Sequence, residues 1–174
     1  MISLETLISK TLANLATRLN NEPIFSVQNY NGEVMEATCK LYSPPQAEEI
    51  LEFENETGLL IPKDFKEFLV QHNGAELFAH PEYGGGINIM NISHMMDLYE
   101  SYREMIPTAW YPIGFDDVGF LWINSEEVTE NTRDCQYLYW SSLIDINEER
   151  TALNSNFEIW LERLITAEGK KFWE

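Results

Sequence analysis

The sequence predicts an α+β domain in which helices flank a mostly antiparallel sheet. Apolar residues recur at helical spacing in five segments, and alternating or continuous apolar runs typical of strands lie between them. Turn signals at Asn31-Gly32 and Asp116-Asp117 join adjacent strand-like runs into hairpins. The resulting order is a helix, two strands, two helices, a strand, a helix, three strands and a helix. It lacks the strand–helix alternation that indicates a parallel sheet.

Length and composition indicate a single domain over residues 1–174. The chain is 44% hydrophobic and 13% aromatic, and no internal repeat or long linker divides it. Its start has no basic segment followed by an unbroken apolar run, and no stretch approaches the about 18 apolar residues of a membrane span. We therefore expect a cytoplasmic protein. Cys39 and Cys135 are expected to be buried free thiols, with a disulfide between them as the alternative.

The formal net charge of −18 argues against two classes of partner. Nucleic acids and anionic membranes bind clusters of Lys and Arg, so we expect this chain to bind neither. Ten carboxylates and one basic residue, Arg133, lie between Glu104 and Glu149. Five glutamates and no Lys or Arg lie between Leu41 and Pro62. This distribution favours fast association with a basic partner; the alternative is an acidic soluble protein without one.

The first 41 residues predict a helix and a hairpin. Residues 3–20 carry a leucine-rich stripe at helical spacing, and Ser3 is the expected N-cap. Residues 24–30 and 33–41 then read as strands. Asn31-Gly32 between them is the strongest short signal for a two-residue type I′ turn.

Ser43 and Gln46 have capping-box spacing and predict a second helix over 46–57. We expect its glutamates to be exposed and Gly58 to end it. The side chains expected to face inward are Ala47, Ile50 and Leu51.

A third helix is predicted over 62–73, and the rest of the chain is organised around it. Pro62 suits the first helical position, and Leu60 and Phe65 have the spacing of a hydrophobic staple. Asp64 is placed where it complements the positive end of the helix dipole. Asn73-Gly74 supplies a left-handed stop. One buried face is expected from Phe65, Phe68, Leu69 and His72.

The remaining elements follow from similar signals. Leu77–Ala79 is a candidate short strand, and 87–92 is a strand that follows a glycine-rich loop. Ser93 is expected to cap a helix that ends before Pro107.

Three further strands and a closing helix complete the prediction. Residues 110–115 and 118–124 form a hairpin through Asp116-Asp117, and 136–141 form another strand. Ser155 and Glu158 form a second capping box. The apolar face of the closing helix is expected from Phe157, Trp160, Leu161, Leu164 and Ile165.

No motif indicates an enzyme, a cofactor or a metal site. The glycine-rich loop 84–86 leads into a strand rather than a helix and lacks the P-loop lysine, so it predicts a turn. A G-x-S-x-G nucleophile motif is absent. Asp116-Asp117 has the adjacency of turn-forming residues, not that of a glycosidase pair. The candidate metal ligands have no zinc-site spacing: His72, His80, His94, Cys39 and Cys135.

The remaining candidate for function is a partner-binding surface in which aromatic residues alternate with carboxylates. We expect the carboxylates of Asp116, Asp117, Glu126 and Glu127 to make the charged contact, with Tyr111 and Trp122 as aromatic anchors. For each aromatic residue the alternative is a place in the core, because about half of a strand's side chains face inward.

Three segments together resemble the SUKH superfamily of bacterial toxin-immunity proteins and fungal cell-wall assembly regulators. The first is Leu60-Ile61-Pro62…Phe65…Phe68-Leu69…Asn73-Gly74, similar to L-P-x-x-[YF]-x-x-F-L…N-G-G. The second is Tyr111-Pro112-Ile113-Gly114-Phe115-Asp116-Asp117-Val118-Gly119, similar to a P-I-G-x-D-G-x-G hairpin. The third is the helix Phe157–Leu164, similar to S-F-x-x-[FW]-L-x-x-L.

The resemblance covers residues 41–166 and leaves 1–40 as an N-terminal helix and hairpin extension. It implies a mixed sheet with flanking helices, no catalytic residues and binding as the activity. It also implies an immunity protein that neutralises a cognate polymorphic toxin, with a basic nuclease domain as the expected partner. The alternative is a scaffold or regulatory adaptor of the same fold without a toxin. The sequence does not indicate an oligomeric state.

Overall fold

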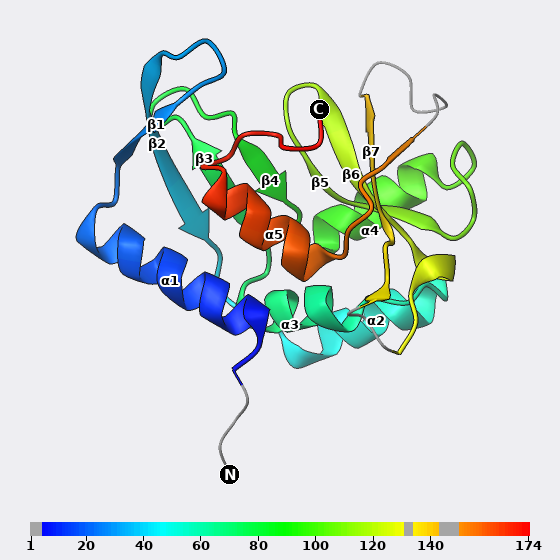
Figure 1. Ribbon diagram of the computed structural model, residues 1–174. Coiled ribbons are helices and arrows are strands. Elements are labelled where there is room, and N and C mark those ends of the chain that lie inside the picture. Colours follow the sequence, from blue (N-terminus) through cyan, green and yellow to red (C-terminus); the bar gives the residue numbers. More distant parts are fainter. Residues whose placement is uncertain (1–4, 131–133, 143–149) are drawn as a thin grey trace.

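The computed structural model describes residues 5–130, 134–142 and 150–174 (Figure 1). Eight strands form one sheet in the order β1 to β8, and helices pack against it, so the α+β prediction is confirmed. Every neighbouring pair of strands is antiparallel. The sheet is therefore antiparallel rather than mixed, because each strand lies beside its predecessor and runs the opposite way.

The described ranges contain five α-helices and one 3-10 helix. The helices are α1 (Leu7–Asn21), α2 (Ala47–Thr57), α3 (Lys63–Gln71), α4 (Ile92–Tyr102), η1 (Ser125–Glu127) and α5 (Phe157–Thr166). The strands are β1 (Phe25–Gln28), β2 (Val34–Leu41), β3 (Ala75–Ala79), β4 (Ile87–Ile89), β5 (Trp110–Phe115), β6 (Gly119–Asn124), β7 (Leu138–Ser142) and β8 (Thr151–Ala152). Strand β8 has no counterpart in the prediction.

Helices cover the centre of the sheet on both faces. In Figure 1, α5 crosses the front of the sheet with α1 beside it, whereas α4 lies behind β5 and β6. Ring contacts of Tyr102 with Phe120 and of His94 with Phe115 hold α4 against the back face. The central strands consequently have no face in solvent, and all of β6 is buried.

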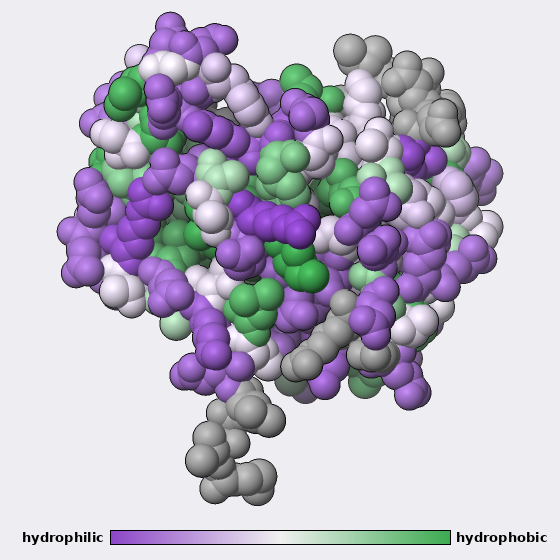
Figure 2. All heavy atoms as spheres, viewed as in Figure 1, coloured by the Kyte–Doolittle hydropathy of each residue, from purple (hydrophilic) through white to green (hydrophobic). Residues whose placement is uncertain are grey.

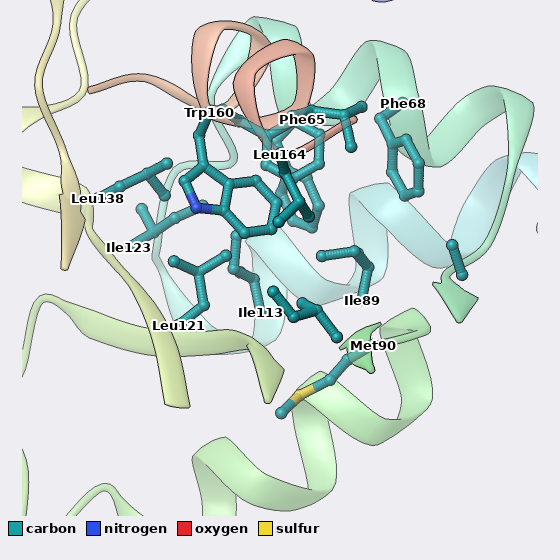
Figure 3. Packing of buried hydrophobic residues seen from close by; sticks show 14 of the residues in the cluster. Phe65, Phe68, Ile89, Met90, Ile113, Leu121, Ile123, Leu138, Trp160 and Leu164 are labelled. Atoms are coloured by element: carbon teal, nitrogen blue, oxygen red, sulfur yellow. The ribbon is translucent and has the colours of Figure 1, made fainter. Parts of the chain in front are cut away.

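The main core lies between the front of the sheet and helices α3 and α5 (Figure 3). Phe65 and Phe68 of α3 and Trp160 of α5 are fully buried, and they point toward strand residues that include Ile113 and Leu121. The phenyl rings of Phe65 and Phe157 lie 4.7 Å apart between centroids. The apolar faces predicted for these two helices are therefore confirmed, except that His72 and Ile165 are only partly buried.

Helix α3 differs from its prediction at the start. Pro62 is the N-cap rather than the first helical residue, and Leu60 is 55% exposed, so the predicted staple is wrong. The end is closer to expectation. Gly74 has φ +97°, and a Cβ there would lie 2.8 Å from the Ile89 carbonyl oxygen, so the stop requires glycine.

The N-terminal hairpin forms with a different turn. Gly32 is the only residue of this loop with a positive φ, whereas a type I′ turn needs a positive φ at both of its central residues. The Asn29 amide donates to the Glu33 carbonyl oxygen at 2.9 Å, which closes a three-residue loop. Gly32 occupies the left-handed position of that loop, and the Asn29 side chain accepts from Asn31 N at 2.9 Å.

Two predicted N-caps in the first half are displaced. Thr6 caps α1 by accepting from the Ser9 amide at 3.1 Å, whereas the predicted cap, Ser3, lies outside the described residues. Gln46, not Ser43, is the N-cap of α2. The backbone amide of Gln46 donates to the Glu49 side-chain carboxylate at 2.9 Å. The inward face of α2 consists of Ile50 and Phe53; Ala47 and Leu51, predicted to face inward, are exposed.

In the second half, asparagines cap helices where serines were predicted. Asn91 accepts from the His94 amide at 2.7 Å at the start of α4, and Asn156 accepts from the Ile159 amide at 3.0 Å at the start of α5. Ser93 is already inside α4, and Ser155 instead donates to the Asn156 carbonyl oxygen. Both residue types are good N-caps, so the choice depends on where tertiary packing starts the helix.

The two cysteines are free and buried, as predicted. Burial raises the pKa of the Cys39 thiol to about 11, which keeps it protonated near neutral pH. In the described part of the chain, no helix combines the length and apolar character needed to cross a membrane.

Candidate partner-binding surface

The predicted aromatic anchors belong to the core. Tyr111 and Trp122 are both 0% exposed. The Tyr111 hydroxyl donates to the Leu60 carbonyl oxygen at 2.8 Å, and the Trp122 indole N–H donates to Ser141 Oγ at 2.7 Å. Their place in the predicted binding surface is therefore wrong. Strand alternation suggested that some of these aromatics face solvent, but helices cover both faces of β5 and β6.

Asp116 also serves the fold. One of its carboxylate oxygens accepts from the amides of Val118 and Gly119, each at 2.9 Å, and shapes the β5–β6 turn. The other lies 2.7 Å from Lys171 Nζ, and both side chains are largely buried. Asp116 is thus already neutralised by the C-terminal tail, which Figure 1 shows ending beside this turn. Its neighbour Asp117 is exposed.

Glu126 and Glu127 lie in η1, directly after β6, and both are exposed. Asn124 starts this short helix by accepting from the Glu126 amide at 3.2 Å. The Tyr139 hydroxyl donates to the Glu127 carboxylate at 2.8 Å. Partial burial and this hydrogen bond raise the pKa of Tyr139 to about 12. The Glu127 carboxylate is therefore oriented but not neutralised.

The structure separates the two predicted acidic pairs. Asp117 lies before the first residue of β6 and Glu126 lies after its last, so about 17 Å of extended chain lies between the pairs. The Asp116-Asp117 turn belongs to the end of the sheet that carries the hairpin loops. Glu126-Glu127 belongs to the opposite end, beside α2. They cannot form one compact contact, and each end must be considered separately.

The end beside α2 gathers further carboxylates that the prediction did not combine. The Leu60 amide donates to Ser125 Oγ at 2.8 Å, which joins the segment after α2 to η1. Figure 1 shows η1 above one end of α2, and the corresponding region of Figure 2 is mainly hydrophilic. We define the helix-end acidic surface as the exposed residues Glu48, Glu52, Glu56, Glu126, Glu127 and Glu130.

A hollow of about 410 Å³ borders this surface at Glu130. Its apolar part is formed by Leu60, Ile61 and Val128, and Glu54 and Glu130 lie at its walls. Lys66 is paired with Glu54 at 2.8 Å, which neutralises one of the two lysines that line the hollow. The walls hold as many lysines as glutamates, so the recess offers an apolar contact for the stem of a long side chain rather than a negative site for its charged head. The spacing of Leu60 and Phe65 predicted a buried hydrophobic staple, whereas Leu60 is exposed and lines this hollow.

The sequence predicted Asp64 only as a complement to the helix dipole, and its burial was not predicted. Asp64 is 3% exposed and accepts from the amides of Phe65 and Glu158, each at 2.9 Å, and from the Tyr137 hydroxyl. The same hydroxyl accepts from the Phe157 amide at 3.0 Å. Burial raises the pKa of Asp64 and raises that of Tyr137 well above its usual value. This group joins the N-terminal ends of α3 and α5 and is closed to any substrate.

Within the described ranges, no three His, Cys, Asp or Glu side chains are arranged to hold a metal ion.

The glycine-rich loop has a backbone reason for its composition. A Cβ at Gly86 would lie 2.4 Å from the Leu77 carbonyl oxygen, so glycine permits the close passage of two chain segments. Of the ten carboxylates between Glu104 and Glu149, Asp145, Glu148 and Glu149 lie outside the described residues, as does Arg133.

The sequence is similar to a known protein family and to two proteins of Bacillus subtilis. Residues 44–163 match the model of the SMI1/KNR4 family (SUKH-1), which is more than half of the chain. The uncharacterized protein YnaB of Bacillus subtilis (strain 168) is 32% identical over 139 residues, covering 80% of this chain and 89% of YnaB. The uncharacterized protein YobM of the same organism is 28% identical over 176 residues, covering 96% of this chain and 91% of YobM.

Proposed function

The chain belongs to the SMI1/KNR4 family (SUKH-1), and from that premise we propose that it is an immunity protein that binds and neutralises a cognate polymorphic toxin. The proposed partner is a basic nuclease domain, and the proposed contact is the helix-end acidic surface. Binding there requires no catalytic residue, metal or cofactor.

The observation that carries the proposal is a set of exposed carboxylates that take no part in the ion pairs of the described residues. None of the five ion pairs found among the described residues includes a member of the helix-end acidic surface. Glu48, Glu52 and Glu56 recur every four residues along α2, so like charges are neighbours on the helix. Each such pair costs roughly 0.2–0.5 kcal/mol of helix stability. Glu48 lies in the first turn, where the helix dipole favours a carboxylate, but Glu52 and Glu56 do not, and a role in binding accounts for these two residues.

Electrostatics favour a nuclease as the occupant. A nuclease needs Lys and Arg in its cleft to hold phosphates, and the same cleft attracts a surface rich in carboxylates. Opposite potentials raise the association rate, which matters for a protein that must capture a toxin before it acts. The apolar recess around Leu60 and Val128 adds a place for one side-chain stem. Occlusion of the cleft would then prevent nucleic acid from entering it.

The test compares two charge-matched variants in binding to the cognate toxin domain, which is to be sought among the genes beside this one. Glu126→Gln with Glu127→Gln, the helix-end variant, removes two charges from η1. Glu82→Gln with Asp117→Asn, the loop-end variant, removes two exposed charges from the β3–β4 loop and the β5–β6 turn. We expect the helix-end variant to associate about tenfold more slowly and with a weaker dependence on salt, since rim charges act mainly on association. The loop-end variant should associate at nearly the rate of the unmodified protein.

Surface kinetics at two salt concentrations provide the measurement. Asp116 stays unchanged in both variants because its carboxylate supports the β5–β6 turn. A larger loss in the loop-end variant would move the contact to Asp117. Equal rates for all three proteins would remove both acidic ends from the interface. Absence of a neighbouring toxin gene would favour the adaptor alternative.

A further inference from the structure

Strand β1 is an open edge of the sheet, and it lies outside the family-matched region. It spans Phe25–Gln28 and precedes residues 44–163, and among the described strands it pairs with β2 alone. Four large apolar side chains are exposed on or beside the β1–β2 hairpin, and Figure 2 shows hydrophobic atoms there at the upper left. These are Ile24 at 48%, Tyr30 at 68%, Val34 at 72% and Met35 at 37% exposure.

The register shows which backbone groups of β1 point away from the sheet. The Asn29 amide bonds to the Glu33 carbonyl oxygen across the hairpin end. Hydrogen-bonded pairs alternate along an antiparallel ladder, so Val27–Met35 and Phe25–Ala37 are the bonded pairs. The N–H and C=O groups of Ser26 and Gln28 therefore face the free edge. Both side chains are exposed, as expected for residues with no cover.

This edge lacks the features that usually block strand addition. Natural sheets protect an edge with Lys, Pro, a bulge or a very short strand. Phe25–Gln28 contains no charged residue and no proline, and its register with β2 is continuous. The opposite edge, β8, has only two residues. An edge left open on one side of an otherwise protected sheet is a candidate for β-augmentation.

Charge selects the occupant. Between Glu22 and Cys39 the chain has three glutamates and no Lys, Arg or Asp. Glu22, Glu33 and Glu36 are exposed around the edge. The two nearest cations in the sequence do not cancel them: Arg18 stacks over the Phe25 ring and is paired with Glu168, and Lys40 lies beyond the part of β2 that pairs with β1. A second copy of this chain would bring the same charges together, in a protein whose net charge is already −18. An extended segment with Lys or Arg would meet opposite charge instead.

We propose that β1 is a docking edge that accepts an extended, basic segment of a partner protein as an additional antiparallel strand. The backbone of Ser26 and Gln28 supplies the hydrogen bonds. Val34 and Tyr30 supply apolar contact beside them, and the surrounding glutamates supply the charge. The inference rests on the hairpin alone and holds whether or not the helix-end acidic surface binds a toxin.

The probe is a capped peptide of about eight residues in which Val and Lys alternate, as strand side chains do. Titration into the full-length protein should shift the backbone amide signals of Ser26 and Gln28 and slow their hydrogen exchange. Two matched peptides serve as controls. One carries a proline at its centre and cannot continue the ladder, and the other has Glu in place of Lys. Both should leave the two amides unchanged.

Ser26→Pro tests the edge itself. The Ser26 amide points away from β2, so proline removes an edge donor without breaking the β1–β2 ladder. Peptide affinity should fall at least about tenfold, because a donor is lost and the ring obstructs the incoming strand. Ser26→Thr keeps the amide and a strand-forming side chain, so it should bind like the unmodified protein. Equal circular dichroism of the two variants establishes that the fold is intact.

Three outcomes would overturn the proposal. The first is no response of the Ser26 and Gln28 amides to the alternating peptide. The second is equal binding of the peptide by Ser26→Pro and Ser26→Thr. The third is dimerisation of the protein through β1 in sedimentation experiments, because the occupant would then be a second copy.

Discussion

Carboxylates have opposite roles at two regions of this molecule: the seam between α3 and α5, and the helix-end acidic surface. At the seam, Asp64 is enclosed and each of its oxygens accepts hydrogen bonds that hold two helices in place. At the helix-end surface, six exposed carboxylates support no other element through an ion pair among the described residues. One region uses the oxygens of a carboxyl group as hydrogen-bond acceptors that build the fold, and the other presents negative charge to solvent.

This difference shows that a carboxylate's role follows from its burial and donors rather than from its place in an acidic run. Asp116 makes the same point within one turn, since it is paired with Lys171 while Asp117 remains exposed. Replacing a carboxylate should therefore lower the free energy of unfolding more when more buried hydrogen-bond donors lose their acceptor. Four predictions follow the comparison: the first tests the apolar part of the seam, and the other three test individual carboxylates.

The largest effect is expected at the apolar part of the seam. Phe68→Ala removes a fully buried ring that contacts Phe65 and Phe157 and should lower the free energy of unfolding by about 3–5 kcal/mol. Val70→Ala in the same helix is the control, because Val70 is 53% exposed and its truncation should cost less than about 1 kcal/mol. Urea denaturation measures both. Similar losses in the two variants would show that the buried face of α3 is placed incorrectly.

Asp64→Ala should have the next largest effect. It leaves the amides of Phe65 and Glu158 without their acceptor, and each buried unsatisfied donor costs about 1–3 kcal/mol, so we expect a loss of about 2–4 kcal/mol. Glu126→Ala, on the exposed surface, should change stability by less than about 0.5 kcal/mol. Equal effects in chemical denaturation would remove the distinction between the two regions.

The pH dependence of the seam has a defined sign. Burial raises the pKa of Asp64 above its unfolded value of 3.8, so ionisation of Asp64 disfavours the folded state. The stability contributed by the protonated carboxyl is fully present below the unfolded pKa and is lost as pH rises through the folded pKa. Asp64→Asn cannot titrate. The stability of the unmodified protein relative to Asp64→Asn should therefore fall with rising pH and then become constant.

Denaturation at a series of pH values measures this difference. A relative stability that rises with pH would mean that the hydrogen bonds to Asp64 outweigh its burial, and the folded pKa would then be depressed.

The smallest effect is expected at Asp116. Asp116→Asn keeps an oxygen that can accept from Val118 and Gly119 but removes the charge that pairs with Lys171, so we expect a loss of about 1 kcal/mol. Asp117→Asn next to it should have no measurable effect on stability. Thermal and chemical denaturation of the two variants provide the comparison. A greater loss for Asp117→Asn would contradict the assignment of the ion pair.

The sequence by itself determined the local architecture, including the two hairpins, the inward face of α3 and the closing helix. It also indicated an α+β domain and the family. These features follow from side-chain periodicity and turn residues, which act over a few positions of the chain. The position of the helix starts was less well determined. Asn156 rather than Ser155 caps α5, because either residue can cap and packing selects between them.

Only the tertiary structure decided which polar and aromatic side chains remain available to a partner. Tyr111 and Trp122 are buried because helices from distant parts of the chain cover both faces of β5 and β6. Asp116 is neutralised by a lysine in the C-terminal tail, and Asp64 is enclosed because α5 packs its first turn against α3. Exposure and pairing depend on contacts between residues far apart in sequence, and neither periodicity nor charge count contains that information.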